Sequence, residues 1–219
     1  MYSEMRHISS DLLDIAGIAG PPVDAFRVAA ALDYEVRWDG GVETGMADAQ
    51  RGIIFLNPAE RPERQHFTLA HEVCELCLAE CFPAEPVQER HRAAMFGASE
   101  LLMPRRWFEP LLRACAANLR DLKASFTNVS HEALAYRLLR ACPAVVSIFD
   151  HGLLRRRVGS RGLAYPRRHL LPAEQRLLDL VVETRADAHR QEAEIALSGY
   201  WICEPGWPRV VLITRGEGE

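Results

Sequence analysis

The sequence predicts a helix-rich α+β fold, in which a helical part with a small sheet is followed by a small α/β part. Over most of the first 141 residues, apolar side chains recur at helical spacing. Two short segments rich in β-branched and aromatic residues precede the longest of these helices and predict a small sheet. After residue 142 the pattern changes to short strand-like segments around one strong helix. These three observations define the fold class.

Proline and glycine set the boundaries of the elements in the first part. "GPP" at 20–22 separates two helices, "FPAEP" at 82–86 ends a longer one, and Pro104 can open the next. Ser130 can cap the last helix, which follows a short helix and a turn. The expected elements are helices at 9–19 and 23–33, strands at 34–38 and 51–57, and helical segments at 62–80, 87–102 and 105–141.

The last part predicts strands around a single helix that begins at Pro172. Its expected elements are strands at 144–149 and 153–158, a helix at 172–191, and strands at 194–205 and 207–214. We therefore expect three domains: 1–104, a helical helix-turn-helix-like segment at 105–142, and a small α/β domain at 143–219.

The composition predicts a soluble cytoplasmic protein. The net charge of −4 gives no general attraction to nucleic acid or to an anionic membrane. No apolar run reaches the length of a membrane span, and the first residues do not read as a signal peptide. Six cysteines without a secretory signal are typical of reduced thiols.

The segment "FTLAHEVCELCL" at 67–78 indicates a metal site. His71 and Glu75 are four residues apart, so on a helix they project from one face and can hold one ion between them. Glu72 lies beside His71, where a general base can reach a metal-bound water. A catalytic zinc takes three protein ligands and a water, so the third ligand must come from another element.

Three residues of the next helix are candidates for that third ligand. His91 shares a face with Ala94 and Leu101, the apolar side that should pack on the preceding helix. Glu89 and Glu100 lie on a different face. Helical phase therefore favours His91.

At this point the sequence resembles the ImmA/IrrE family of zinc metallo-endopeptidases. The similarity lies in "HFTLAHE" followed by "FGASELLMP", with the leading "GIIFLN" and the later "VSHEALAYRLL", and it covers roughly residues 10–140. The resemblance implies a minimal zincin-like metallopeptidase domain at 1–104. In the family, a small-molecule sensor domain of GAF-like type follows. Residues 143–219 are short for a full copy, so a reduced version, a dimerisation module and a substrate-docking module are the alternatives.

The resemblance also implies a ligand set, with two positions exchanged. The family places two histidines on the first helix and a glutamate ten residues before "LLMP". Here His71 and the base Glu72 match, but Glu75 replaces the second histidine and His91 replaces the glutamate. Two imidazoles and one carboxylate remain, so the charge placed on the ion is unchanged. We therefore predict one zinc per chain, held by His71, Glu75 and His91; manganese suits the same set.

The implied mechanism is hydrolysis of a peptide bond, with Glu72 as the general base on a zinc-bound water. Two residues of the "ALAYRLL" helix, Tyr136 and Arg137, are candidates for steadying the oxyanion, although core packing and surface exposure explain them as well. The strand at 51–57 is a candidate edge for holding the substrate extended.

Other features fit ordinary packing better than a second site. Cys74, Cys77 and Cys81 have the spacing of a buried helical stripe, with a redox-sensing thiol as the alternative. The start of the last helix in 121–140 lacks the side chains that read DNA, which favours a packing role. The basic concentration is expected to form a solvated face, and docking of an acidic partner or of a nucleic acid backbone is its alternative. It consists of Arg155, Arg156, Arg157, Arg161, Arg167 and Arg168.

Two functions of different classes follow. The first is a cytoplasmic zinc-dependent endopeptidase; the resemblance implies that it cleaves a regulatory protein, such as a helix-turn-helix repressor or an antitoxin, in response to stress or to a mobile element. The second is a catalytically weak or inactive descendant that binds metal and a regulator. A DNA-binding regulator is the least supported, and direct nucleic-acid binding is not expected.

Overall fold

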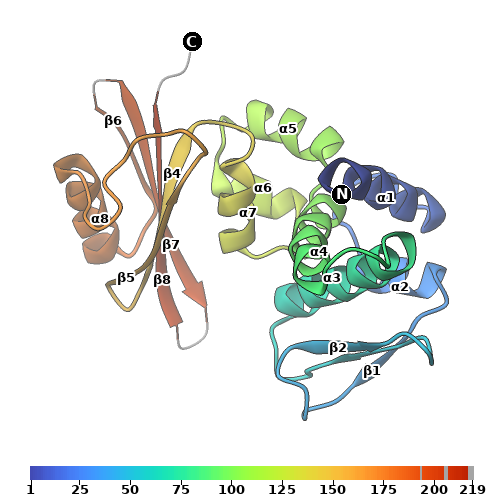
Figure 1. Ribbon diagram of the computed structural model, residues 1–219. Helices are drawn as coiled ribbons and strands as arrows, with labels where there is room; N and C mark the ends of the chain where they lie inside the picture. Colours follow the sequence, from blue (N-terminus) through green and yellow to red (C-terminus); the bar gives the residue numbers. More distant parts are fainter. Residues whose placement is uncertain (193, 205–206, 217–219) are drawn as a thin grey trace. The chain divides into compact units, whose positions relative to one another are not determined.

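The computed structural model describes residues 1–192, 194–204 and 207–216 and divides into two compact units, residues 1–130 and 131–219 (Figure 1). Its described residues form eight helices and two sheets, which confirms the predicted α+β class. None of the helices in this part of the chain is long and apolar enough to cross a bilayer.

The first unit contains six helices. They are α1 (Tyr2–Ile15), α2 (Ala25–Ala31), α3 (Pro62–Cys81), α4 (Val87–Leu102), α5 (Arg105–Ala114) and α6 (Leu119–Ser125). The predicted bounds of α3 and α4 are confirmed to within one residue, because prolines mark where these helices begin. The prediction for α1 was wrong by seven residues at its start, since the first turns bury Met5 in the core. Gly17, at φ 63°, lies just past its end.

Helix α4 lies against both α3 and α1 because its packed faces carry small residues. Ala93, Ala94 and Ala98 are fully buried there. A Cβ atom added at Gly97 would lie 2.4 Å from Met5 Cε on α1 and 3.0 Å from Cys74 Sγ on α3. The three helices therefore meet at Gly97, and this close approach brings residues of α3 and α4 within reach of one another.

The sheet of the first unit has three strands, β1 (Glu35–Trp38), β2 (Gly45–Asp48) and β3 (Ile53–Leu56), in the order β1-β3-β2. The sequence did not predict β2, because "GMAD" has little strand propensity. It forms by antiparallel pairing with β3 and packs on α3. The strand predicted to offer a substrate edge is β3, which lies in the middle of the sheet. That prediction was wrong, and β2 is the edge strand beside α3.

We predict that Gly45→Ala destabilises the first unit by about 1–3 kcal/mol, because the new Cβ would lie 2.3 Å from Thr68 Cγ2. Thr68 is buried and β-branched, so its methyl group cannot turn away cheaply. Thermal and urea unfolding measure the change. Thr68→Ser removes the methyl group, so the double variant should recover most of the loss; no recovery would show that β2 and α3 do not meet in this way.

His66, near the start of α3, links that helix to α2. Its Nδ1 accepts a hydrogen bond from the backbone N–H of Ala25 at 3.3 Å, and its ring meets the edge of Phe26 at 5.1 Å between centroids. Burial lowers the pKa of His66, while the charges of Asp24 and Glu63 act in the opposite direction. The folded protein therefore favours a neutral imidazole that accepts a proton at Nδ1.

This lowered pKa predicts a loss of stability in acid. Below about pH 6.5 the unfolded chain binds a proton at His66 that the folded chain resists, so stability falls as the pH drops further. His66→Asn keeps an acceptor near the Nδ1 position and removes the titration. Urea unfolding at pH 7.5 and 5.5 should show a smaller pH effect in this variant; an equal effect in both proteins would contradict the assignment.

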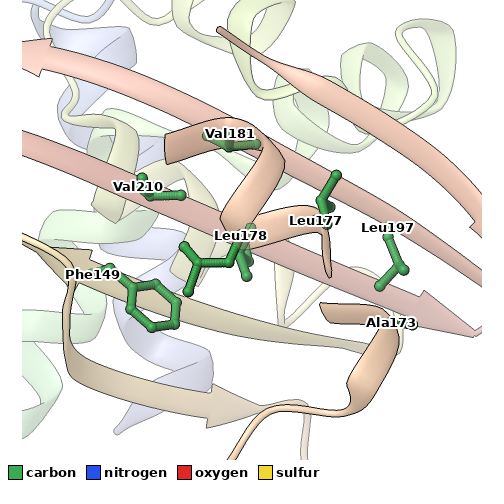
Figure 2. Packing of buried hydrophobic residues seen from close by; sticks show 8 residues of the cluster. Phe149, Ala173, Leu177, Leu178, Val181, Leu197 and Val210 are labelled. Carbon is green, nitrogen blue, oxygen red and sulfur yellow. The ribbon is translucent and has the colours of Figure 1, made fainter. Parts of the chain in front are cut away.

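The second unit is an antiparallel five-stranded sheet, ordered β5-β4-β8-β7-β6, with α8 on one face. Its elements are α7 (His131–Leu138), β4 (Ala144–Asp150), β5 (Leu153–Gly159), α8 (Pro172–Thr184), β6 (Ala188–Glu192), β7 (Ile195–Glu204) and β8 (Trp207–Gly216). Figure 2 shows its core, where Leu177, Leu178 and Val181 of α8 pack over Phe149 and Val210 of the sheet. The predicted strand at 194–205 is confirmed up to Glu204; Pro205 lies outside the described residues.

Helix α8 is shorter than predicted, because residues 188–192 form strand β6 instead of a helical continuation. Arg185 adopts a left-handed conformation (φ 51°), which ends the helix. Asp187 then accepts a hydrogen bond from the backbone N–H of Trp201 at 2.8 Å, and β6 pairs with β7. Antiparallel pairing with the following strand thus overrides the helical pattern of "RADAHRQ".

An ion pair inside the second unit removes one arginine from the predicted basic face. The guanidinium of Arg157 and the carboxylate of Glu174 are 2.8 Å apart and almost fully buried. Arg157 also donates to Ser147, and Glu174 accepts from Thr214 and from the backbone N–H of Leu171. Every charge is thus hydrogen-bonded, as burial requires. The expectation that Arg157 belongs to a solvated face was wrong.

Candidate metal centre

Two neighbouring helices of the first unit bring His71, Glu75 and His91 together. His71 and Glu75 lie one turn apart on α3, and His91 projects from α4, sixteen residues beyond Glu75. Their ligand atoms all lie within 4.8 Å of one another. The structure therefore assembles the three residues that the sequence predicted as a ligand set. Glu89, on the same helix as His91, instead pairs with Arg92 at 2.6 Å.

Glu75 is the centre of this cluster. Its Oε2 lies 3.0 Å from His71 Nε2 and 3.3 Å from His91 Nδ1. The two imidazole rings meet edge to face, with centroids 4.6 Å apart and an interplanar angle of 78°. One nitrogen of each ring thus lies close to the same carboxylate oxygen.

The cluster fits a divalent ion in chemistry and in spacing. Zinc accepts imidazole nitrogen and carboxylate oxygen at about 2.1 Å, so neighbouring ligands in a tetrahedral shell are about 3.4 Å apart. The spacings from Glu75 to the two histidines are close to that value. They are also hydrogen-bonding distances, so Glu75 can hold the two rings in place before an ion binds.

His71 has the electrostatics of a metal ligand. Burial lowers its pKa, the negative charge of Glu75 acts to raise it, and the neighbouring His91 acts in the same direction as burial. Its Nδ1 is buried without a hydrogen bond of standard geometry, although the backbone carbonyl of Ala94 on α4 acts on the ring. A neutral imidazole with Nε2 directed at Glu75 is the form that binds metal.

Glu72 lies next to the cluster and has a shifted pKa. Burial and, to a smaller extent, the negative charge of Glu75 raise the pKa of this carboxyl to about 6. His91 opposes the shift, as does a hydrogen bond from the backbone of Ala47 on β2. A carboxylate tuned toward neutrality suits a general base. The sequence offered no signal for Ala47 because it did not predict β2.

The three cysteines of α3 do not form a buried stripe. Cys74 is fully buried, Cys77 partly, and Cys81 is exposed, so the predicted stripe was wrong at its C-terminal end. Burial raises the pKa of Cys74, and it raises the pKa of Cys77 to about 11. Both thiols stay protonated at neutral pH, which makes them poor redox sensors.

Tyr136 and Arg137, the candidates for an oxyanion role, lie on α7 in the second unit. The guanidinium of Arg156 lies 6.0 Å from the Tyr136 ring centroid, and burial raises the pKa of Tyr136 to about 12. Arg137 is buried. Helix α7 is attached to the sheet through Arg209, which binds Glu132 at 2.8 Å and Asp150 at 2.6 Å. The oxyanion role of Tyr136 or Arg137 stays a prediction.

A helix with His and Glu at successive positions, a facing helix with a further ligand and a sheet edge beside them define a metallopeptidase-like domain. Residues 32–139 match the family model of the IrrE N-terminal-like domain, peptidase family M78. This part of the chain belongs to that family, as the sequence resemblance implied.

A solved structure supports the fold of the whole chain. A transcriptional regulator of Mycobacterium tuberculosis superimposes with a TM-score of 0.72 over 98% of this chain and 76% of that chain. The two sequences are 12% identical, so the likeness concerns the fold alone. A comparison with curated proteins finds no match by sequence.

We predict that the protein, purified without chelator, carries close to one zinc or manganese per chain and that His71→Ala, Glu75→Ala and His91→Ala each remove it. Loss of one of three ligands leaves too few donors for a stable site. Elemental analysis of the dialysed protein gives the stoichiometry. Glu89→Ala is the matched control on α4 and should keep the metal; full metal content in His91→Ala would overturn the ligand assignment.

Proposed function

We propose that this protein is a cytoplasmic zinc-dependent endopeptidase in which His71, Glu75 and His91 hold the ion and Glu72 is the general base. The observation that carries the proposal is the position of Glu72: one residue from a ligand, partly buried, with its pKa raised to about 6. A bound zinc ion would polarise a peptide carbonyl and make water more acidic. Glu72 would accept the proton of that water and deliver it to the leaving amine.

The edge strand β2 is the proposed binding edge for an extended substrate. It pairs only with β3 among the described strands, and its neighbour Glu72 accepts a hydrogen bond from the backbone of Ala47. Main-chain pairing along such an edge holds a peptide extended. The hydrogen bond from Ala47 holds Glu72 at the same edge, so a peptide paired there would lie beside the proposed base. This arrangement supports hydrolysis of a peptide bond.

The proposed substrate is a regulatory protein, such as a helix-turn-helix repressor or an antitoxin. Family membership of residues 32–139 supports a protein substrate. The neighbour of like fold is named a transcriptional regulator, which supports a role in gene control without naming a target. Helix-turn-helix proteins encoded next to this chain are the first candidates to test.

A catalytically weak descendant that binds metal and a regulator is the second candidate. The exchange of Glu75 and His91 favours it, because each ligand now approaches from a different helix than in the family pattern. The His91 side chain is 57% exposed, so α4 contributes a ligand with little packing around it. A shifted ligand can turn the open coordination position away from Glu72, and a misplacement of about 1 Å is enough to cost roughly 100-fold in rate.

Two variants separate these functions. Glu72→Gln should keep the metal and lower cleavage of the protein substrate by at least about 100-fold, since the general base is lost. Mass spectrometry of fragments after co-incubation gives the readout. Unchanged cleavage in Glu72→Gln would rule out its role as the base.

The double variant Glu75→His/His91→Glu restores the family order of ligands and serves as the second test. If the natural protein is an active peptidase, the double variant should bind metal and cleave at a similar or lower rate. Cleavage by the double variant alone, with the natural chain inert but metal-loaded, would establish the second candidate instead.

A further inference from the structure

The second unit carries a basic surface, and none of its residues belongs to the candidate metal centre. From His151 to Ala173 the sequence contains six arginines and no aspartate or glutamate, in a chain whose net charge is −4. Arg157 is withdrawn into its buried pair with Glu174, and Arg156 lies over Tyr136. The basic surface consists of the remaining four, Arg155, Arg161, Arg167 and Arg168, all exposed.

Within the described part of the chain, no carboxylate forms an ion pair with these four arginines. Elsewhere in the same unit, surface arginines do have partners, as Arg176 has Glu192 at 2.6 Å. Exposed arginines without counter-charges attract groups of opposite sign, so this part of the second unit is a candidate for binding an acidic ligand.

Buried contacts hold the loop after β5, which carries three of these four arginines. Arg157 Nε donates to the backbone carbonyl of Pro166 at 2.7 Å, and its guanidinium lies 5.7 Å from the centroid of the Tyr165 ring. Tyr165 in turn lies against Gly159, where a Cβ atom would be only 2.3 Å from the ring. The loop after β5 is thus attached at its middle to the strand that carries Arg155. Arg161 and Arg167 flank that attachment, so the surface is preorganised.

The strand beside these arginines is an edge strand. β5 pairs with β4 on one side, and no described strand pairs with the other. A bulge lies opposite Ile148 and Phe149, so Arg155 is the extra residue, without a partner in the register. Leu153, at the start of β5, is 61% exposed. Open main-chain groups, an exposed apolar side chain and adjacent cations together fit one kind of ligand.

We propose that β5 and the basic surface bind an extended acidic polypeptide segment, which adds as a strand to the sheet edge and places its carboxylates against these arginines. The free strand edge favours a peptide over nucleic acid. A peptide strand can pair in register with the open main-chain N–H and C=O groups of β5, whereas a nucleic acid duplex cannot. Guanidinium groups bind carboxylates in bidentate fashion, which gives the contact its direction. The proposal concerns binding and does not depend on catalysis in the first unit.

Fluorescence anisotropy with a labelled ten-residue Glu-Thr repeat tests the proposal on the full chain. The Gln-Thr repeat is the matched neutral peptide. We expect the acidic peptide to bind and the neutral one to bind at least about 10-fold more weakly, with affinity falling as salt is raised. Equal binding of the two peptides, or no binding of either, would overturn the proposal.

Charge reversals locate the contact. Arg155→Glu and Arg167→Glu should each weaken binding by about 5-fold or more, since a rim attraction becomes a repulsion. Arg190→Glu is the matched control: Arg190 is exposed on β6, the opposite edge of the same sheet. Equal losses in all three variants would place the effect in the net charge of the protein and not at β5.

Backbone methylation separates strand addition from simple charge attraction. N-methyl groups on alternate residues of the Glu-Thr peptide block main-chain donors on one edge of the strand, and methylation of the other alternate set blocks the opposite edge. We expect one set to abolish binding and the other to preserve it. Equal affinity of both methylated peptides would overturn strand addition. Displacement of the peptide by a 20-base-pair DNA duplex at lower concentration than by the unlabelled peptide would instead assign the surface to nucleic acid.

Discussion

The close approach of α3 and α4 is the constraint on which the candidate site depends. Gly97, Ala94 and Ala98 leave so little side chain on one face of α4 that Cys74 of α3 and Met5 of α1 lie where larger side chains would otherwise be. This packing brings His91 of one helix within 3.3 Å of Glu75 on the other. A larger residue at Gly97 would separate the helices, so the packing beside the cluster controls the distances between the candidate ligand atoms.

The same cluster shows why a ligand exchange between two helices is physically tolerable. Two imidazoles and a carboxylate place the same net charge around an ion whichever helix carries the carboxylate, so the charge of the ligand set does not distinguish the two orders. The exchange changes which residues lie near the carboxylate. With the carboxylate at position 75, its negative charge lies three residues from Glu72 and raises the pKa of that carboxyl, an effect that a histidine there would not have. The exchange thus raises the pKa of the proposed base while it preserves the kinds of donor in the proposed ligand set.

The sequence predicted those parts of the fold and site that depend on residues close in the chain. The bounds of α3 and α4 followed from prolines at their starts, and His71 and Glu75 followed from helical spacing. His91 needed helical phase in addition, because its partner is on another element. The strands β2 and β6 escaped prediction because "GMAD" and "AHRQE" have little strand propensity of their own, and each becomes a strand by antiparallel pairing with the strand that follows it in the chain. The prediction that Arg157 is solvated was wrong because its partner, Glu174, lies seventeen residues away in the chain and no local pattern indicates the pair.

Side-chain exposure increases from His71 to Glu75 to His91, and this difference limits the positions at which another residue can be accommodated. His71 is almost fully buried, the Glu75 side chain is 31% exposed and the His91 side chain 57%. A buried ligand is held by surrounding atoms on every side, so a change at His71 must satisfy the packing of α4 as well as the ion. Glu75 and His91 face solvent in part, and a side chain of different shape can be accommodated there by moving into water. Among the three proposed ligands, the two positions that differ from the family pattern are therefore those at which the structure constrains side-chain shape least, whereas His71, which keeps the family identity, is enclosed by the core.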